Sequence, residues 1–358
     1  MNTNQKELKI TAFRGLCAKP GREALLTQGE ATQMLNFRVD ENGYLKKRSG
    51  YARVCTLPAK PSGICYCKLD TDTEYAWYLV CQNTLYRYSP ARAKLQTVAQ
   101  LPSGSTSAQV EMFFSHGALY FLDGKEYSVC HGAQITPVEG YIPLRFCAVD
   151  PATGIGSEQE AVNLLSAYGR ATFRFRTDTD TFTLPESAVG VLWVKRGGMT
   201  CMDFTVVEAP GTDGRMAVKM QTAFLPSEEY VEICYRRSAP SGREKLTACP
   251  HVYRYGGSGD VRLLFFGGEG GQVWFSADAE QGPTYVPQEA HFTVGRGQEP
   301  VTGVCRCFDH LLLFTEHQVW SAAYQSAQKN FALYLLRGDL GNLSPKSVQS
   351  YRQADIFL

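Results

Sequence analysis

The sequence predicts an all-β protein, an incomplete β-propeller interrupted by an immunoglobulin- or fibronectin-like β-sandwich. One basis is a recurring hairpin unit, in which an apolar strand and a polar turn lead into a second strand that opens on apolar residues. A second is the spacing of these units. They lie 34 positions apart from Leu85 to Leu119 and 46 apart from Val273 to Val319, close to the period of propeller blades. The third is the interval of 154 positions from Leu119 to Val273, which leaves room for one small inserted domain.

Composition supports this fold class. The chain has 358 residues, enough for two or three domains, with 44% hydrophobic and 20% charged residues. Its 19 Tyr and 19 Phe favour strands, while 33 Gly and 17 Pro supply turns. A net charge of +1 predicts no bulk attraction to nucleic acid or membranes. We therefore expect neither specific nucleic-acid recognition nor a membrane location.

Residues 1–60 form an N-terminal arm of different character. The turn at Asn42-Gly43 predicts a hairpin that joins Met34–Val39 to Tyr44–Lys47. Lys46, Lys47 and Arg48 are the strongest basic run of the chain. Two interpretations stay open for them: a solvated strand edge that charge protects from aggregation, or a contact with phosphate or an acidic partner surface.

The blades are predicted in two parts, residues 61–145 and 246–358. The first part contains the hairpins that join Tyr75–Val80 to Leu85–Tyr88 and Glu111–Phe114 to Leu119–Leu122. Between the two parts, residues 146–245 are predicted to form the inserted sandwich, with six or seven short strands separated by turns. The Cys…Trp…Cys pattern of a true antibody domain is missing.

The run Ala354–Leu358 resembles the apolar strand of another hairpin, and the sequence predicts no return strand for it. We therefore expect an apparently shortened last blade with an unpaired edge. The edge would be closed by the N-terminal arm in cis or by a strand from a partner. Ile356, Phe357 and Leu358 join Lys46, Lys47 and Arg48 as candidate interaction residues.

The sequence shows no recognisable reactive site. The twelve cysteines include two C-x-C pairs, Cys65/Cys67 and Cys305/Cys307. A four-thiolate metal site is one interpretation, but zinc sites more often use C-x2-C spacing, and reduced cysteines packed as small hydrophobes are favoured. The Gly-rich stretches lack the context of a phosphate-binding loop, and the six histidines are scattered. We expect no catalytic, cofactor-binding or metal-binding residues.

One stretch has a specific likeness. Ser276, Asp278, Gly282, Thr284 and Tyr285 are similar to the Asp-box of sialidase-type propellers, with two extra residues and Tyr in place of Trp. That box is a structural turn and is not catalytic. The arginine cluster and Tyr–Glu pair of a sialidase cannot be placed from the spacing.

A broader likeness extends over most of the chain. Ordered motifs resemble those of bacteriophage and prophage tail or head-completion proteins: Phe13–Leu16, Gly29–Ala31, Leu35–Phe37, Gly43–Tyr51, Asp150–Gly156, Asn163–Leu165, Val273–Ser276, Pro283–Pro287, Val294-Gly295, Pro300–Gly303, Gly338–Gly341 and Ser344-Pro345.

The resemblance implies a non-enzymatic structural component of the virion, at the head–tail connector or tail. Its partners would be portal, adaptor or tail subunits, with the chain itself in a homo-oligomeric ring. It would be made in the cytoplasm of the bacterial host and carried in the virion. The alternatives are a cytosolic propeller that serves as a protein-binding platform unrelated to phage, and a sialidase-like glycoside hydrolase.

Overall fold

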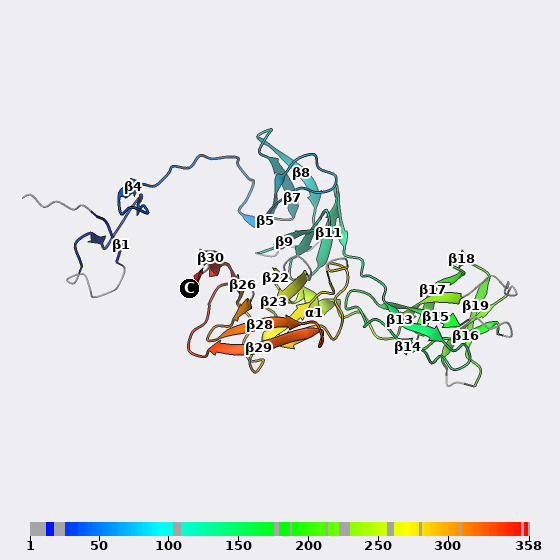
Figure 1. Ribbon diagram of the computed structural model, residues 1–358. Helices are drawn as coiled ribbons and strands as arrows, with labels where there is room; N and C mark the ends of the chain where they lie inside the picture. The colour runs from blue at the N-terminus through cyan, green and yellow to red at the C-terminus, as the bar shows by residue number, and fades with distance from the viewer. Residues whose placement is uncertain are drawn as a thin grey trace, which may run out of the picture. The chain divides into compact units, whose positions relative to one another are not determined.

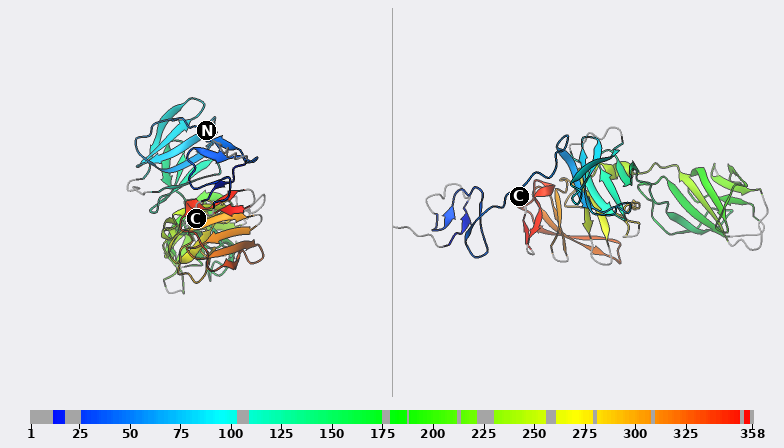
Figure 2. Two further views of the ribbon diagram at one scale, coloured as in Figure 1. Left: turned by 90° about the vertical axis from the view of Figure 1, so that its left-hand side faces the viewer. Right: turned by 90° about the horizontal axis from the view of Figure 1, so that it is seen from above.

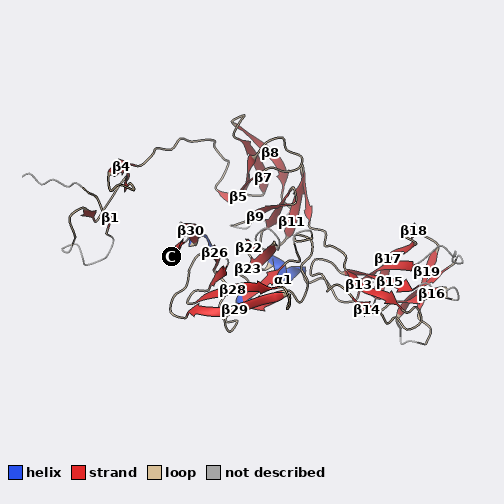
Figure 3. Cartoon of the chain, in the orientation of Figure 1, coloured by secondary structure: helices blue, strands red, loops and turns tan. Residues whose placement is uncertain are grey.

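The computed structural model describes residues 12–17, 26–102, 109–174, 179–186, 188–211, 214–221, 230–255, 261–278, 281–307, 310–351 and 354–356. Strands dominate these residues (Figures 1 and 3), and α1 (Arg243–Thr247) is the one α-helix among them. The chain divides into two units, Met1–Thr56 and Leu57–Leu358. The all-β prediction is confirmed.

The first unit consists of two small strand pairs. β1 (Gly15–Leu16) pairs in parallel with β2 (Glu30–Ala31), and β3 (Phe37–Val39) pairs antiparallel with β4 (Leu45–Lys47). The β3–β4 turn is closed by the Asp40 carboxylate, which accepts the backbone N–H groups of Asn42 at 3.0 Å and Tyr44 at 2.9 Å. The predicted hairpin is therefore present.

The second unit contains four antiparallel sheets, each built from four consecutive strands. The first sheet comprises β5 (Pro61–Cys67), β6 (Ala76–Cys81), β7 (Thr84–Ser89) and β8 (Lys94–Gln100). The second comprises β9 (Glu111–Ser115), β10 (Ala118–Leu122), β11 (Tyr127–His131) and β12 (Gln134–Pro137). The third comprises β22 (His251–Tyr255), β23 (Arg262–Phe266), β24 (Gln272–Phe275) and β25 (His291–Thr293). The fourth comprises β26 (Gly303–Cys307), β27 (His310–Phe314), β28 (Val319–Gln325) and β29 (Asn330–Arg337).

The four sheets adjoin as the blades of a propeller do (Figures 1 and 2). The leading strands contact one another in succession: β5 with β9, β9 with β22, and β22 with β26. Each pair of neighbouring sheets shares an apolar core, with Tyr78 and Phe121 between the first and second sheets and Phe275 and Leu313 between the third and fourth. Strand β10 is buried along its whole length. Its continuous apolar sequence fits a strand with both faces covered.

The inserted domain is a two-layer sandwich. Its larger sheet has the order β14-β13-β15-β21-β17-β18, and its smaller sheet has the order β16-β20-β19. Apolar side chains from both sheets, such as Phe173 and Phe182, form one core. The strand bounds are β13 (Leu144–Val149), β14 (Ser157–Glu158), β15 (Tyr168–Arg174), β16 (Thr181–Thr183), β17 (Ala188–Arg196), β18 (Met199–Cys201), β19 (Phe204–Glu208), β20 (Met216–Met220) and β21 (Tyr230–Arg237).

The sandwich has more strands than the sequence predicted, because β14, β16 and β18 are only two or three residues long. Such short strands show no alternation that a sequence pattern can reveal. Helix α1 was also missed, because it extends over only five residues. It lies where the chain leaves the sandwich and enters the third sheet.

The end of the chain requires a correction. After a 3-10 turn at η3 (Pro345–Ser347), β30 (Gln349–Tyr351) pairs antiparallel with β31 (Ala354–Ile356). The expectation that Ala354–Leu358 has no return strand is therefore wrong. Its partner β30 has only three residues, too few for a sequence pattern to reveal a strand.

Candidate functional site

The predicted basic run lies on an exposed hairpin edge of the first unit. Lys46 and Lys47 belong to β4, and the backbone N–H of Arg48 donates to the Asn36 carbonyl at 2.7 Å. The strand register places Arg38 directly opposite Lys46. Like charges at opposed positions destabilise a strand pair, so an acidic neighbour would relieve this repulsion. Arg38 lies outside the basic run of the sequence, although the turn at Asn42-Gly43 fixes the register that brings it opposite Lys46.

The same unit exposes its apolar residues. A groove of about 290 Å³ is lined by Phe13, Met34, Leu35, Phe37 and Leu45, among others. Leu35 is 82% exposed. Among residues 12–17 and 26–56 no side chain is buried. This described part of the first unit therefore has hydrogen-bonded strands without a hydrophobic core of its own.

The C-terminal candidates belong to a different unit of the chain from the basic run. Ile356 is in β31, opposite Gln349, and belongs to the second unit. Phe357 and Leu358 lie outside the described residues. Lys46, Lys47 and Arg48 belong to the first unit.

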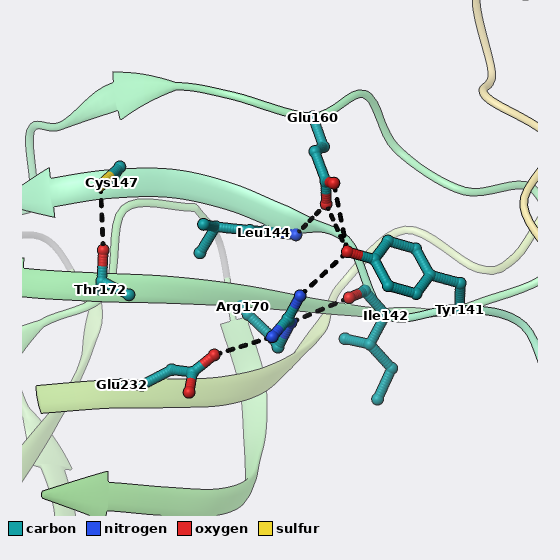
Figure 4. Close-up of polar contacts among 8 residues, drawn as sticks. All are labelled: Tyr141, Ile142, Leu144, Cys147, Glu160, Arg170, Thr172 and Glu232. Atoms are coloured by element: carbon teal, nitrogen blue, oxygen red, sulfur yellow. Dashed lines mark hydrogen bonds and ion pairs between the residues drawn. The ribbon is translucent and has the colours of Figure 1, made fainter. Parts of the chain in front are cut away.

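The base of the sandwich carries a polar network that the sequence did not reveal (Figure 4). Tyr141 donates its hydroxyl hydrogen to Glu160 at 3.0 Å, and Glu160 also accepts the backbone N–H of Leu144 at 2.5 Å. Arg170 donates to the Tyr141 hydroxyl at 3.1 Å and to Glu232 at 2.9 Å. Burial and the Glu160 charge raise the pKa of Tyr141, which keeps its phenol protonated.

Two further bonds are drawn in Figure 4, one from a side chain to the backbone and one between two side chains. Arg170 also donates from Nε to the Ile142 carbonyl at 2.9 Å, and the Thr172 hydroxyl donates to the Cys147 sulfur at 3.3 Å. Tyr141 and Glu160 are 19 positions apart, a separation that matches no strand or helix period. The network therefore fastens the ends of β13 and β15 to the segment that enters the sandwich.

Asn163 joins this base to the third sheet. Its side chain is fully buried, and its amide nitrogen donates to the carbonyls of Tyr141 and Thr284, each at 2.8 Å. Its oxygen accepts the backbone N–H groups of Leu165 and Val286, each at 3.1 Å. One side chain thus satisfies four backbone groups from three segments of the chain.

The Asp-box-like stretch is held at the same junction. Ser276 is fully buried, and its hydroxyl accepts the backbone N–H of Leu263 at 2.9 Å and donates to the Ala277 carbonyl at 2.8 Å. The Tyr285 hydroxyl donates to the Ala161 carbonyl at 2.9 Å. In the described residues this stretch forms a turn that docks on the entry to the sandwich.

A cleft of about 690 Å³ opens beside this turn. Its lining includes Arg145, Arg262, Asp278, Glu289 and Lys329. The Arg262 guanidinium lies 4.1 Å from the centre of the Tyr324 ring and donates to the Ser276 carbonyl at 3.1 Å. Cationic and anionic side chains alternate here, so the cleft does not select one sign of ligand charge.

The described residues contain no group of three or more His, Cys, Asp or Glu side chains that could hold a metal ion. All twelve cysteines are free thiols. Burial raises the pKa of the Cys234 thiol to about 12 and that of Cys249 to about 11, so both thiols are protonated near neutral pH. Within the described part of the chain, no helix is both long and apolar enough to span a bilayer.

No family model matches the sequence, and no curated protein matches it. Among solved structures, the chain is similar to BBS1N from its crystal structure in complex with ARL6DN, with 11% identity and a TM-score of 0.29. That match covers 80% of this chain and 71% of the other. It is also similar to the extracellular domain of BT4673 from B. thetaiotaomicron, with 10% identity and a TM-score of 0.19. That match covers 81% of this chain and 31% of the other.

Proposed function

We propose that this protein is a non-enzymatic structural component of a bacteriophage or prophage particle, at the head–tail connector or tail, where it acts through protein–protein assembly. The observation that carries the proposal is the placement of the ordered motifs. Several of them contain or flank buried side chains that hold separate segments of the chain together, which is the role expected of motifs in a protein that acts through assembly.

Asn163, in the motif Asn163–Leu165, ties the sandwich to the third sheet through the four bonds described above. The segment Pro283–Pro287, another of these motifs, supplies two of the groups that it binds. Two motifs that stand far apart in the sequence therefore meet at one buried side chain.

Asn342 plays the matching part in the fourth sheet, between the motifs Gly338–Gly341 and Ser344-Pro345. It is fully buried, and its amide nitrogen donates to the Ser344 carbonyl at 2.7 Å. The backbone carbonyl of Asn342 accepts the Thr302 hydroxyl at 2.6 Å, and Thr302 lies in the motif Pro300–Gly303. A side chain at Gly341 would meet the Thr315 carbonyl oxygen at 2.3 Å, so only glycine fits there.

The first unit supplies the docking surface in this proposal. Residues 1–56 hold ten Lys or Arg and five Asp or Glu, whereas the whole chain holds 36 and 35. The rest of the chain therefore has 26 basic and 30 acidic residues. A basic module with exposed apolar side chains and no core in its described residues would gain a core by binding an acidic, partly apolar surface of a portal, adaptor or tail subunit.

The test is whether the protein is part of the particle. In the encoding organism, the gene is deleted or tagged, particles are induced, and DNA-filled particles are purified and analysed by mass spectrometry and electron microscopy. We expect the tagged chain in purified particles, and capsids without functional tails after deletion. Particles that lack the chain and keep full infectivity after its deletion would overturn the proposal and favour the unrelated protein-binding platform.

A hydrolase remains the second candidate, because Tyr141 and Glu160 form a tyrosine–glutamate pair near Arg145. The purified chain is assayed with a fluorogenic sialoside, beside the Tyr141→Phe variant. We expect no turnover from either protein, since burial and the Glu160 charge raise the pKa of the Tyr141 phenol and so disfavour its nucleophilic, deprotonated form. Turnover that Tyr141→Phe abolishes would establish the hydrolase.

A further inference from the structure

The first sheet has one face packed on the second sheet and an opposite face whose paired rows carry no charged side chain. Its register sets two rows of side chains across the four strands on the face turned away from the second sheet. One row is Ile64, Leu79, Tyr86 and Thr97, and the other is Tyr66, Trp77, Tyr88 and Leu95. None of these eight side chains is charged.

The opposite face is the one that packs on the second sheet. In β6, Ala76, Tyr78 and Val80 belong to the core shared with the second sheet, whereas Trp77 and Leu79 between them do not. Successive side chains of a strand point to opposite faces. The two rows above therefore form a distinct surface, which we call the outer face.

The outer face is exposed at its leading strands. Ile64 is 56% exposed, Tyr66 50% and Trp77 40%. The Tyr66 ring lies 4.7 Å from the Trp77 ring and 5.6 Å from the Tyr75 ring, centre to centre. An antiparallel sheet with one solvated face normally has polar side chains on that face. Rows of uncharged side chains on the outer face are therefore typical of a face that is covered.

We propose that a second copy of this chain covers the outer face with its own outer face, which gives a twofold symmetric dimer of first sheets packed face to face. A twofold contact brings identical surfaces together, so any charge there would meet its own copy or a near neighbour. The eight positions carry no charge, and the contact therefore has no such repulsion to overcome.

The exposed area of the outer face can be compared with the area that a stable dimer interface buries. Aromatic side chains bury about 150–250 Å² each, so the exposed parts of Tyr66, Tyr75 and Trp77, with Ile64, offer roughly 400 Å² per copy. A stable interface buries about 800 Å² per partner. The exposed cluster supplies about half of this area. Leu79 and Tyr88, in the middle of the two rows, are each already only 7% exposed, so the remainder would come from Thr97 and the sheet rims. Sheets packed in this way lie about 10 Å apart.

The first test is the oligomeric state of the full chain, measured by sedimentation velocity over a wide range of concentration. We expect a dimer for the natural sequence. Tyr66→Lys and Trp77→Lys should each raise the dissociation constant by about 30-fold or more, because each places two ammonium groups in an apolar contact. Tyr334→Lys is the matched control, since Tyr334 is 61% exposed on β29 of the fourth sheet. That variant should dimerise like the natural sequence.

Circular dichroism checks that each variant is folded. The fold should tolerate Tyr66→Lys more readily than Trp77→Lys, because Tyr66 is 50% exposed and Trp77 is 40% exposed. A natural sequence that stays monomeric at every concentration would overturn the proposal. So would a dimer that both outer-face lysines leave intact, or one that Tyr334→Lys weakens equally.

The second test locates the contact. A photoreactive benzoylphenylalanine replaces Tyr66, and equal amounts of isotopically light and heavy chains are mixed before irradiation. We expect light–heavy cross-links that join β5 of one copy to β5 or β6 of the other. Cross-links confined to one chain, which would mean that another part of the same chain covers the face, would refute the dimer. Cross-links from Tyr66 to the fourth sheet of a second copy would also refute it.

Discussion

Replacing Asn163 with Ala should destabilise the protein severely, because three backbone groups would lose the only hydrogen-bond partner that they have among the described residues. These are the N–H groups of Leu165 and Val286 and the carbonyl of Tyr141. The Thr284 carbonyl keeps the backbone N–H of Tyr141 at 2.9 Å. A buried polar group without a partner costs about 1–3 kcal/mol. The expected loss in the free energy of unfolding is therefore about 4 kcal/mol, a large share of a typical domain's stability.

The assay is urea unfolding followed by intrinsic fluorescence, and the matched control is Asn342→Ala. Asn342 is equally buried. Its amide nitrogen donates one short bond, to the carbonyl of the exposed residue Ser344, and one longer bond of 3.4 Å to the Thr302 carbonyl. Because water can replace the partner of Ser344, we expect a loss of about 1–2 kcal/mol. A loss at Asn163 below about 1.5 kcal/mol, or no larger than that at Asn342, would refute the reasoning.

Three further predictions concern other sites. Tyr285→Phe removes the hydroxyl that donates to the Ala161 carbonyl, and the same urea assay should show a loss of about 1 kcal/mol; no loss would mean that this bond does not hold the turn. The pKa of Glu299 is lowered, first by a hydrogen bond from Thr315. Ionised Glu299 therefore contributes fully to the free energy of unfolding above the ordinary glutamate pKa. This contribution is lost as the pH falls through the lowered pKa. The Glu299→Gln variant should melt below the natural protein at pH 7 and match it in strong acid, and an equal gap at both pH values would contradict this. The Cys234 thiol, with its pKa raised to about 12 by burial, should resist a disulfide reagent in the native protein, while all twelve cysteines react after denaturation without reductant; several linked pairs would contradict this.

The sequence alone determined the local hairpins. The turns at Cys81–Thr84 and Ser115–Gly117 join strands that stand next to each other in the chain, and β6–β7 and β9–β10 pair where the alternation and turn residues indicated. The all-β class follows from many such units, because each depends on residues only a few positions apart. The exposed hairpin with Lys46 and Lys47 was predictable for the same reason.

The tertiary structure decided what holds these units together. Asn163 reaches Thr284 across 121 positions, and no periodicity of the sequence links the two. The Tyr141–Glu160 pair and the partner of β31 also depend on where distant or weakly patterned segments come to lie. The outer face around Trp77 is a further case. An uncharged row of strand residues indicates a face that is covered. The sequence does not tell which segment covers it, because that depends on how whole sheets pack against each other.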